Sequence, residues 1–97
     1  MYKVKVSSDA KKDLRNISKY IAKDNPPRAI TFTQEMLNNF KNKVSIFPKT
    51  GMKCKHFYYT VYQGYYLFYD INDEVQTIEL LRIVNSFQYT EYQDFVE

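Results

Sequence analysis

The first half of the chain shows two spacings of hydrophobic residues, one typical of a strand and one typical of a helix. Apolar and polar side chains alternate over residues 2–6, which predicts a half-buried strand. Apolar residues then recur every three or four positions over residues 8–23, which predicts an amphipathic helix. The same period resumes after Asn25, a good helix-capping residue followed by two prolines, and predicts a longer helix that ends near Phe47. Because the link is short, the two helices should form an antiparallel hairpin.

The second half of the chain has the pattern of strands. A basic loop is expected over residues 49–56. Two aromatic-rich runs, residues 57–62 and 65–71, are joined by Gln63-Gly64, which predicts a tight β-hairpin. Residues 75–84 alternate again and predict the third strand of an antiparallel meander.

The order of elements is strand, helical hairpin, three-stranded meander and a C-terminal segment at residues 88–96, which forms a short helix or a tail. Helices gathered before a meander predict an α+β fold with the hairpin packed on one face of the sheet. Strict alternation in the last strand places Ile78, Leu80 and Val84 on one face. The 97 residues are enough for one domain, expected to span residues 1–97.

Composition narrows the class of protein. Aromatic residues make up 18% of the chain, with 10 Tyr and 7 Phe, so rings should fill much of the core. Cys54 is the only cysteine, which excludes an internal disulfide. The chain has no apolar run of membrane-spanning length, and we expect a cytoplasmic protein. It has no phosphate loop, zinc-ligand spacing or serine triad, so we expect no metal and no cofactor.

Charge is distributed unevenly along the chain. Residues 1–55 carry 13 Lys or Arg and 4 Asp or Glu, a net of +9, whereas residues 56–97 carry Arg82 against 7 acidic residues, a net of −6. A basic half suits an acidic peptide or a phosphate backbone. The lysines of the first helix fit a solvated face as well as a binding surface. A denser cluster favours binding and comprises Lys41, Lys43, Lys49, Lys53 and Lys55.

Four short patterns, in order and at matching spacing, resemble the RelE/ParE toxins over essentially the whole chain. They are Ala10-x-x-Asp13-Leu14-x-x-Ile17-x-x-Tyr20-Ile21, Asn25-Pro26-x-x-Ala29-x-x-Phe32, Phe47-Pro48-x-x-Gly51 and Tyr65-Tyr66-Leu67-Phe68-Tyr69-Asp70-Ile71. The resemblance implies the toxin of a type II toxin–antitoxin pair. It also implies an acidic, DNA-binding cognate antitoxin that wraps around the toxin, with operator DNA bound only through that antitoxin.

Two activities occur among these toxins: ParE-like members bind and poison DNA gyrase, and RelE-like members cut messenger RNA on the ribosome. RNA cleavage needs a proton acceptor, a proton donor and groups that stabilise extra charge on the phosphate. The resemblance assigns these roles, if the chain is a nuclease, to Lys53, Lys55, His56, Arg82 and Tyr92.

The chain departs from the nuclease pattern at two arginine positions. Tyr66 stands where an arginine often follows the hairpin glycine, and Asn85-Ser86-Phe87-Gln88 stands where a basic run often follows the last strand. We therefore expect a ParE-like toxin that binds gyrase. The alternatives are a ribosome-dependent endoribonuclease and a non-toxic relative that binds its antitoxin.

Other residues are candidates for contacts with the antitoxin or the target. They are Lys41, Lys43, Lys49, Tyr66, Asn85, Gln88 and Tyr89. For three candidate groups a structural role competes with the functional one. His56 also fits an ordinary strand start, Arg82 also fits a local pair with a residue such as Glu79, and the tyrosines also fit a core.

Overall fold

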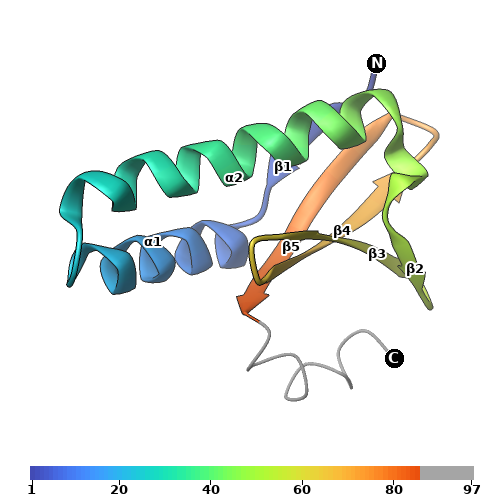
Figure 1. Ribbon diagram of the computed structural model, residues 1–97. Helices are drawn as coiled ribbons and strands as arrows, with labels where there is room; N and C mark the ends of the chain where they lie inside the picture. Colours follow the sequence, from blue (N-terminus) through green and yellow to red (C-terminus); the bar gives the residue numbers. More distant parts are fainter. Residues whose placement is uncertain (86–97) are drawn as a thin grey trace.

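The computed structural model describes residues 1–85 and shows a helical hairpin beside a curved sheet (Figure 1). In chain order the elements are β1 (Lys3–Val6), α1 (Ser8–Ala22), α2 (Pro26–Ile46), the 3-10 helix η1 (Pro48–Thr50), β2 (Met52–Cys54), β3 (Phe57–Tyr62), β4 (Tyr65–Asn72) and β5 (Thr77–Asn85).

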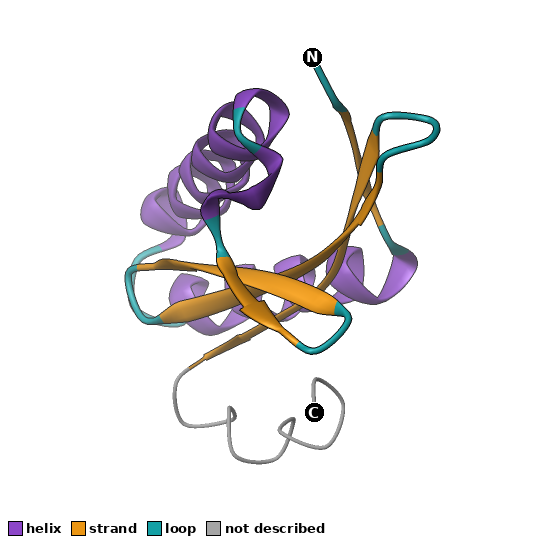
Figure 2. Ribbon diagram, turned by 90° about the vertical axis from the view of Figure 1, so that its right-hand side faces the viewer, coloured by secondary structure: helices purple, strands orange, loops and turns teal. Residues whose placement is uncertain are grey.

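The sheet has five strands in the order β1-β5-β4-β3-β2. Strands β2 to β5 form an antiparallel meander, and β1 joins the far side of β5 in parallel. Figure 2 shows that the sheet is curved, with α2 on its concave side. The N-terminal strand therefore closes one edge of the meander, and the short strand β2 forms the other edge.

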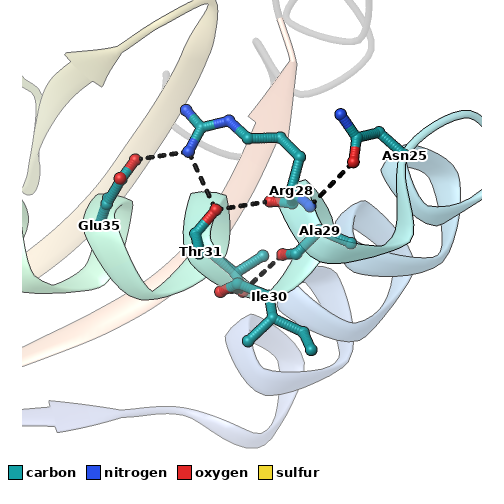
Figure 3. Close-up of polar contacts among 7 residues, drawn as sticks. Asn25, Arg28, Ala29, Ile30, Thr31 and Glu35 are labelled. Carbon is teal, nitrogen blue, oxygen red and sulfur yellow. Dashed lines mark hydrogen bonds and ion pairs between the residues drawn. The ribbon is translucent and has the colours of Figure 1, made fainter.

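Local capping defines where each helix begins. The Ser7 hydroxyl oxygen accepts a hydrogen bond from the backbone N–H of Ala10 at 3.0 Å. The Asn25 side-chain oxygen accepts one from the N–H of Arg28 at 3.2 Å, and a proline occupies the first position of α2 (Figure 3). Each cap satisfies a donor that would have no partner inside the helix.

The main core lies between the two helices and one face of the sheet. Leu67 and Tyr69 of β4, together with Ile78 and Leu80 of β5, are fully buried on this face. The helices contribute Ala10, Ile17, Phe32, Met36, Phe40 and Val44. Burying these side chains is the main stabilising contribution, because each large apolar side chain gains about 1.5–3 kcal/mol on burial.

A second, smaller cluster lies on the opposite face of the sheet. Phe68 and Val84 are buried there, and partly buried hydrophobic side chains pack against them. Those neighbours are Cys54, Phe57, Tyr59 and Tyr66. The high aromatic content thus serves both faces of the sheet.

The predicted fold class is confirmed, and the helices and the Gln63-Gly64 hairpin lie where expected. Gln63 and Gly64 both have positive φ, 44° and 87°, which suits a two-residue hairpin. No helix of the described residues is long and apolar enough to cross a membrane. The predicted C-terminal segment lies outside the described residues.

Three strand predictions are wrong in detail. Part of the expected basic loop is strand β2, because its residues pair with β3. The last strand begins at Thr77 rather than at residue 75. The β4–β5 register shifts by one residue and leaves Leu81 without a partner on β4. Because of this bulge, Ile83 rather than Val84 joins the main core.

Candidate functional site

Four basic side chains surround a cleft at the edge of the sheet. They are Lys49 of η1, Lys53 of β2, and Lys55 and His56 in the turn between β2 and β3. The cleft has a volume of about 310 Å³, and its remaining walls are Tyr58, Asp70, Ile71 and Asp73. Three predicted catalytic candidates, Lys53, Lys55 and His56, thus lie together, with Lys49 beside them.

Tyr69 fixes the segment that carries Lys49. Its hydroxyl donates a hydrogen bond to the backbone oxygen of Pro48 at 2.7 Å and accepts one from the N–H of Gly51 at 3.1 Å. The ring is fully buried, and this burial raises the pKa of the Tyr69 hydroxyl above its ordinary value of 10.0. Tyr69 therefore stays a neutral donor at physiological pH and attaches η1 to the core.

Position 51 requires glycine because there is no room for a side chain, and not because of its backbone dihedral angles. A Cβ at this position would lie 2.5 Å from the backbone oxygen of Tyr59 and 2.7 Å from the hydroxyl of Tyr69. Real Cβ atoms do not approach so closely, so only glycine lets the chain pass between η1 and β2 at this point.

The turn that carries Lys55 and His56 is strained. Lys55 has a φ of 53°, in the left-handed region that glycine, asparagine and aspartate occupy most readily. Such strain often accompanies a functional requirement for the side chain that bears it. The strained turn places Lys55 and His56, both exposed, at one rim of the cleft.

The cleft also contains two carboxylates, which limit its positive charge. Asp70 accepts a hydrogen bond from the N–H of Ile71 at 2.9 Å. Asp73 accepts one from the Tyr2 hydroxyl at 2.6 Å, and this bond raises the pKa of Tyr2. The cleft can hold an anion against its lysines, but it is not uniformly basic.

Arg82, the remaining described catalytic candidate, lies elsewhere. Its guanidinium donates to the carboxylate of Asp13 on α1, from Nε at 2.9 Å and from Nη2 at 3.2 Å. The same carboxylate accepts the backbone N–H of Ile83 at 2.9 Å. Arg82 is thus paired, as one alternative expected, but with Asp13 of α1, 69 residues away along the chain, and not with a local residue such as Glu79.

The other predicted contact residues are dispersed. Lys41 and Lys43 are exposed near the end of α2, where Lys43 lines a separate hollow of about 180 Å³ beside β2 and β3. Tyr66 and Asn85 are half-buried at the hairpin end of the meander. Gln88, Tyr89 and Tyr92 lie outside the described residues.

One surface was not predicted from the sequence. A hollow of about 500 Å³ is lined by Tyr2, residues 46–50 and Asp73. Ile46 and Phe47 are 58% and 69% exposed beside it, although the helical pattern assigned residues up to Phe47 to a packed helix. Exposed apolar side chains around a hollow are typical of a protein contact surface. The sequence signal for this surface was Pro48, because a proline ends the helix before it and leaves the last apolar residues of α2 unpacked.

Comparison with known proteins identifies the family. Residues 4–86 match the model of the ParE toxin of the type II toxin–antitoxin system parDE. No curated protein matches the chain.

Solved structures share the fold at low sequence identity. The chromosomal ParDE toxin–antitoxin system from P. aeruginosa matches with a TM-score of 0.74 and 15% identity, over 88% of this chain and 96% of that one. The RelBE2 toxin–antitoxin complex from Mycobacterium tuberculosis matches with a TM-score of 0.67 and 22% identity, over 87% and 96%. The intact E. coli RelBE complex matches with a TM-score of 0.58 and 19% identity, over 89% and 98%.

The family model spans most of the chain, and the structural matches cover nearly the full length of the RelE and ParE toxins. The strand, helical hairpin and meander described above agree with both. The chain therefore belongs to the ParE toxin family and is a type II toxin of the RelE/ParE superfamily.

Proposed function

We propose that this toxin is ParE-like in action: it inhibits growth by binding an essential target, DNA gyrase, without cleaving RNA. The observation that supports this most strongly is the placement of the arginines. None of the three arginines of the chain lines the basic cleft, although all three lie within the described residues.

The arginine placement bears on activity because of the chemistry of RNA cleavage. Attack by a 2′-hydroxyl builds negative charge on the phosphate, and a fixed donor that stabilises this charge is commonly worth 10²–10³ in rate. Arg82 and Arg28 instead bind Asp13 and Glu35. Flexible lysines facing two carboxylates make a weaker site for the transition state.

A cognate antitoxin is the second part of the proposal. The structures similar to this chain include toxin–antitoxin complexes, and the net charge of +9 over residues 1–55 favours an acidic partner. The apolar hollow beside Ile46 and Phe47 offers a place for anchoring side chains of that partner. Operator DNA would then be bound by the complex through the antitoxin.

A second candidate function, ribosome-dependent RNA cleavage, is favoured by one observation. Lys53, Lys55 and His56 converge on one cleft and are all exposed. A histidine can take or give a proton near neutral pH, and lysines can bind phosphate. Under this alternative the lysines would carry the charge stabilisation without help from arginine.

The two functions predict different orders in which DNA synthesis and protein synthesis stop. The chain is expressed in a bacterium without its antitoxin, and thymidine and methionine incorporation are followed over the first minutes. The gyrase proposal expects thymidine incorporation to fall first. It also expects the purified chain to inhibit DNA supercoiling by gyrase and to leave ribosome-bound RNA uncut. An early fall in methionine incorporation with cut RNA would instead establish the nuclease.

Matched variants then test the cleft. Lys53→Gln with Lys55→Gln removes two charges from the cleft, whereas Lys3→Gln with Lys5→Gln removes two exposed charges from β1. A nuclease should lose at least about 100-fold in cleavage rate with the cleft pair and little with the β1 pair. If parent and variants all allow growth and leave gyrase unaffected, the chain is a non-toxic relative and the proposal fails.

A further inference from the structure

The outer side of α1 carries a continuous row of positive charge. Lys11, Arg15 and Lys19 follow one another at intervals of four residues, and the C-cap residue Lys23 continues the row. All four are exposed, and we refer to them as the basic ridge. Residues four apart are neighbours on a helix, so successive charges rise by about 6 Å and the ridge extends over about 18 Å.

This arrangement opposes helix stability. Like charges four residues apart repel each other along a helix, and the ridge contains three such pairs in succession. None of its four members forms an ion pair with another described residue. Lys19 and Lys23 favour the negative C-terminal end of the helix, but Lys11 and Arg15 gain nothing from it, so the stability of the fold does not explain the whole ridge.

The acidic residues near the ridge either bind other residues or lie at the two ends of α1. Asp13 binds Arg82 and the backbone of Ile83. The neighbouring helix α2 has a single acidic residue, Glu35, and its carboxylate binds Arg28 at 2.8 Å (Figure 3). Asp9 in the first turn of α1 and Asp24 beyond its end leave the centre of the ridge without a counter-charge.

We propose that the basic ridge binds the phosphodiester backbone of duplex DNA. Duplex DNA carries one negative charge about every 1.7 Å along its axis, so a row of about 18 Å can contact several phosphates. Lysine and arginine contacts to phosphates carry no sequence information, so the binding is independent of sequence. Tyr20, the large hydrophobic side chain exposed on α1, adds a hydroxyl that can donate to a phosphate.

The distribution of apolar surface favours DNA over an acidic protein as the occupant. Protein interfaces are anchored by apolar and aromatic side chains in a desolvated centre. The exposed apolar side chains Ile46 and Phe47 surround the hollow at the other end of α2, away from the ridge. Tyr20 is the one large hydrophobic side chain that the described part of α1 exposes, so the ridge has the charge of a nucleic-acid surface and little of the apolar area that anchors a protein interface.

The inference goes beyond the proposed function and does not depend on it. DNA binding by the isolated toxin is measured without gyrase, so failure of one proposal leaves the other intact. A toxin that also holds DNA would be retained near any DNA-bound target.

The test is the affinity of the full chain for a fluorescent mixed-sequence duplex of about 30 base pairs, measured at roughly 50 to 200 mM salt. With four phosphate contacts, the logarithm of the binding constant should fall against the logarithm of salt with a slope of about −3.6. Arg15→Gln with Lys19→Gln should reduce the magnitude of that slope by about 2 and weaken binding at low salt at least tenfold.

The matched control is Lys3→Gln with Lys5→Gln, which removes the same charge from exposed positions on β1. The control should retain most of the affinity and the slope of the parent. Equal losses in both variants, or no duplex binding by the parent at 50 mM salt, would overturn the proposal. Loss of antitoxin affinity in the ridge variant, with duplex binding unchanged, would also overturn it and assign the ridge to an acidic protein.

Discussion

Asp13 connects α1 to β5, and its removal should lower the free energy of unfolding of this toxin substantially. Its carboxylate accepts two hydrogen bonds from Arg82 and one from the N–H of Ile83. Strand β1 pairs with β5 only as far as Leu80. Asp13 therefore binds the edge of β5 just where its neighbouring strand has ended.

The magnitude follows from the burial of this pair. The side chain of Asp13 is 12% exposed and that of Arg82 is 24% exposed. Removing one partner of a fully buried ion pair costs about 3–5 kcal/mol, whereas an exposed pair contributes about 0–1 kcal/mol. We expect Asp13→Ala to lower the free energy of unfolding by about 2–3 kcal/mol, because both Arg82 and the N–H of Ile83 lose an acceptor.

Urea unfolding followed by circular dichroism measures this change. Asp13→Asn keeps an oxygen for the N–H of Ile83 and should lose only about 1–2 kcal/mol. Asp9→Asn, an exposed carboxylate in the first turn of the same helix, is the control and should lose no more than about 0.5 kcal/mol. For a domain of this size, the loss in Asp13→Ala corresponds to a fall in Tm of about 10–20 °C.

A double-mutant cycle with Arg82→Met separates the ion pair from the backbone contact. We expect a coupling free energy of about 1.5 kcal/mol between Asp13 and Arg82, since the pair is largely shielded from water. A coupling below about 0.5 kcal/mol would refute the pairing argument. A loss in Asp9→Asn as large as that in Asp13→Ala would refute the specific role of Asp13.

Three further predictions concern the anchored turn and the basic ridge. Gly51→Ala should lower the free energy of unfolding by about 2 kcal/mol or more, because its Cβ would overlap the backbone of Tyr59. Thr50→Ala, at the exposed residue just before it, is the control, and equal losses would contradict the steric reason. Tyr69→Phe should lower the free energy of unfolding by about 1–3 kcal/mol below pH 10. Because the pKa of Tyr69 is raised in the folded state, the parent loses stability as the pH rises from 10.0 through that folded-state pKa, and the variant should lose less over the same range. An alkaline pH profile unchanged from that of the parent would contradict this. Arg15→Glu, in the middle of α1, should raise the free energy of unfolding by about 0.5–1 kcal/mol, since its two repulsive pairs with Lys11 and Lys19 become attractive. A loss of stability at low salt would show that the ridge is not under repulsion.

The long elements of the fold were predictable because their periods are local properties of the sequence. Both helices carry many turns of amphipathic pattern, and the Gln63-Gly64 turn has the residues that its left-handed backbone favours. Strand β2 was not predictable, because three residues show no alternation and become a strand only by pairing with β3. Its existence is a consequence of tertiary structure.

The bulge at Leu81 could not be found from alternation either. The hydroxyl of Ser7 donates to the backbone oxygen of Leu81 at 2.8 Å, and Asp13 accepts the N–H of Ile83 at 2.9 Å. Both contacts join residues about 70 positions apart. They act on the edge of β5 where the register changes, and they explain why a pattern read along one strand placed Val84 on the wrong face.

The sequence could place only part of the candidate site, because only some of its residues are neighbours along the chain. Lys53, Lys55 and His56 are close in sequence, and a single turn brings them to one cleft. No local pattern could place Lys49 beside them, because η1 is positioned by a hydrogen bond from Tyr69. Nor could a local pattern separate Arg82 from them, because Asp13, with which Arg82 forms an ion pair, lies on α1.

Helix α1 combines two roles that have opposite effects on stability. Its inner side stabilises the fold, since Ala10 and Ile17 are buried and Asp13 binds β5. Its outer side carries the basic ridge, whose mutual repulsion lowers stability. Substitutions on the inner side should therefore reduce stability and every activity together. Neutral substitutions at Lys11 and Arg15, away from the C-terminal end of the helix, should increase stability while reducing polyanion binding. That opposition distinguishes a binding surface from a solvated helix face, whose charges can be removed without any loss of binding.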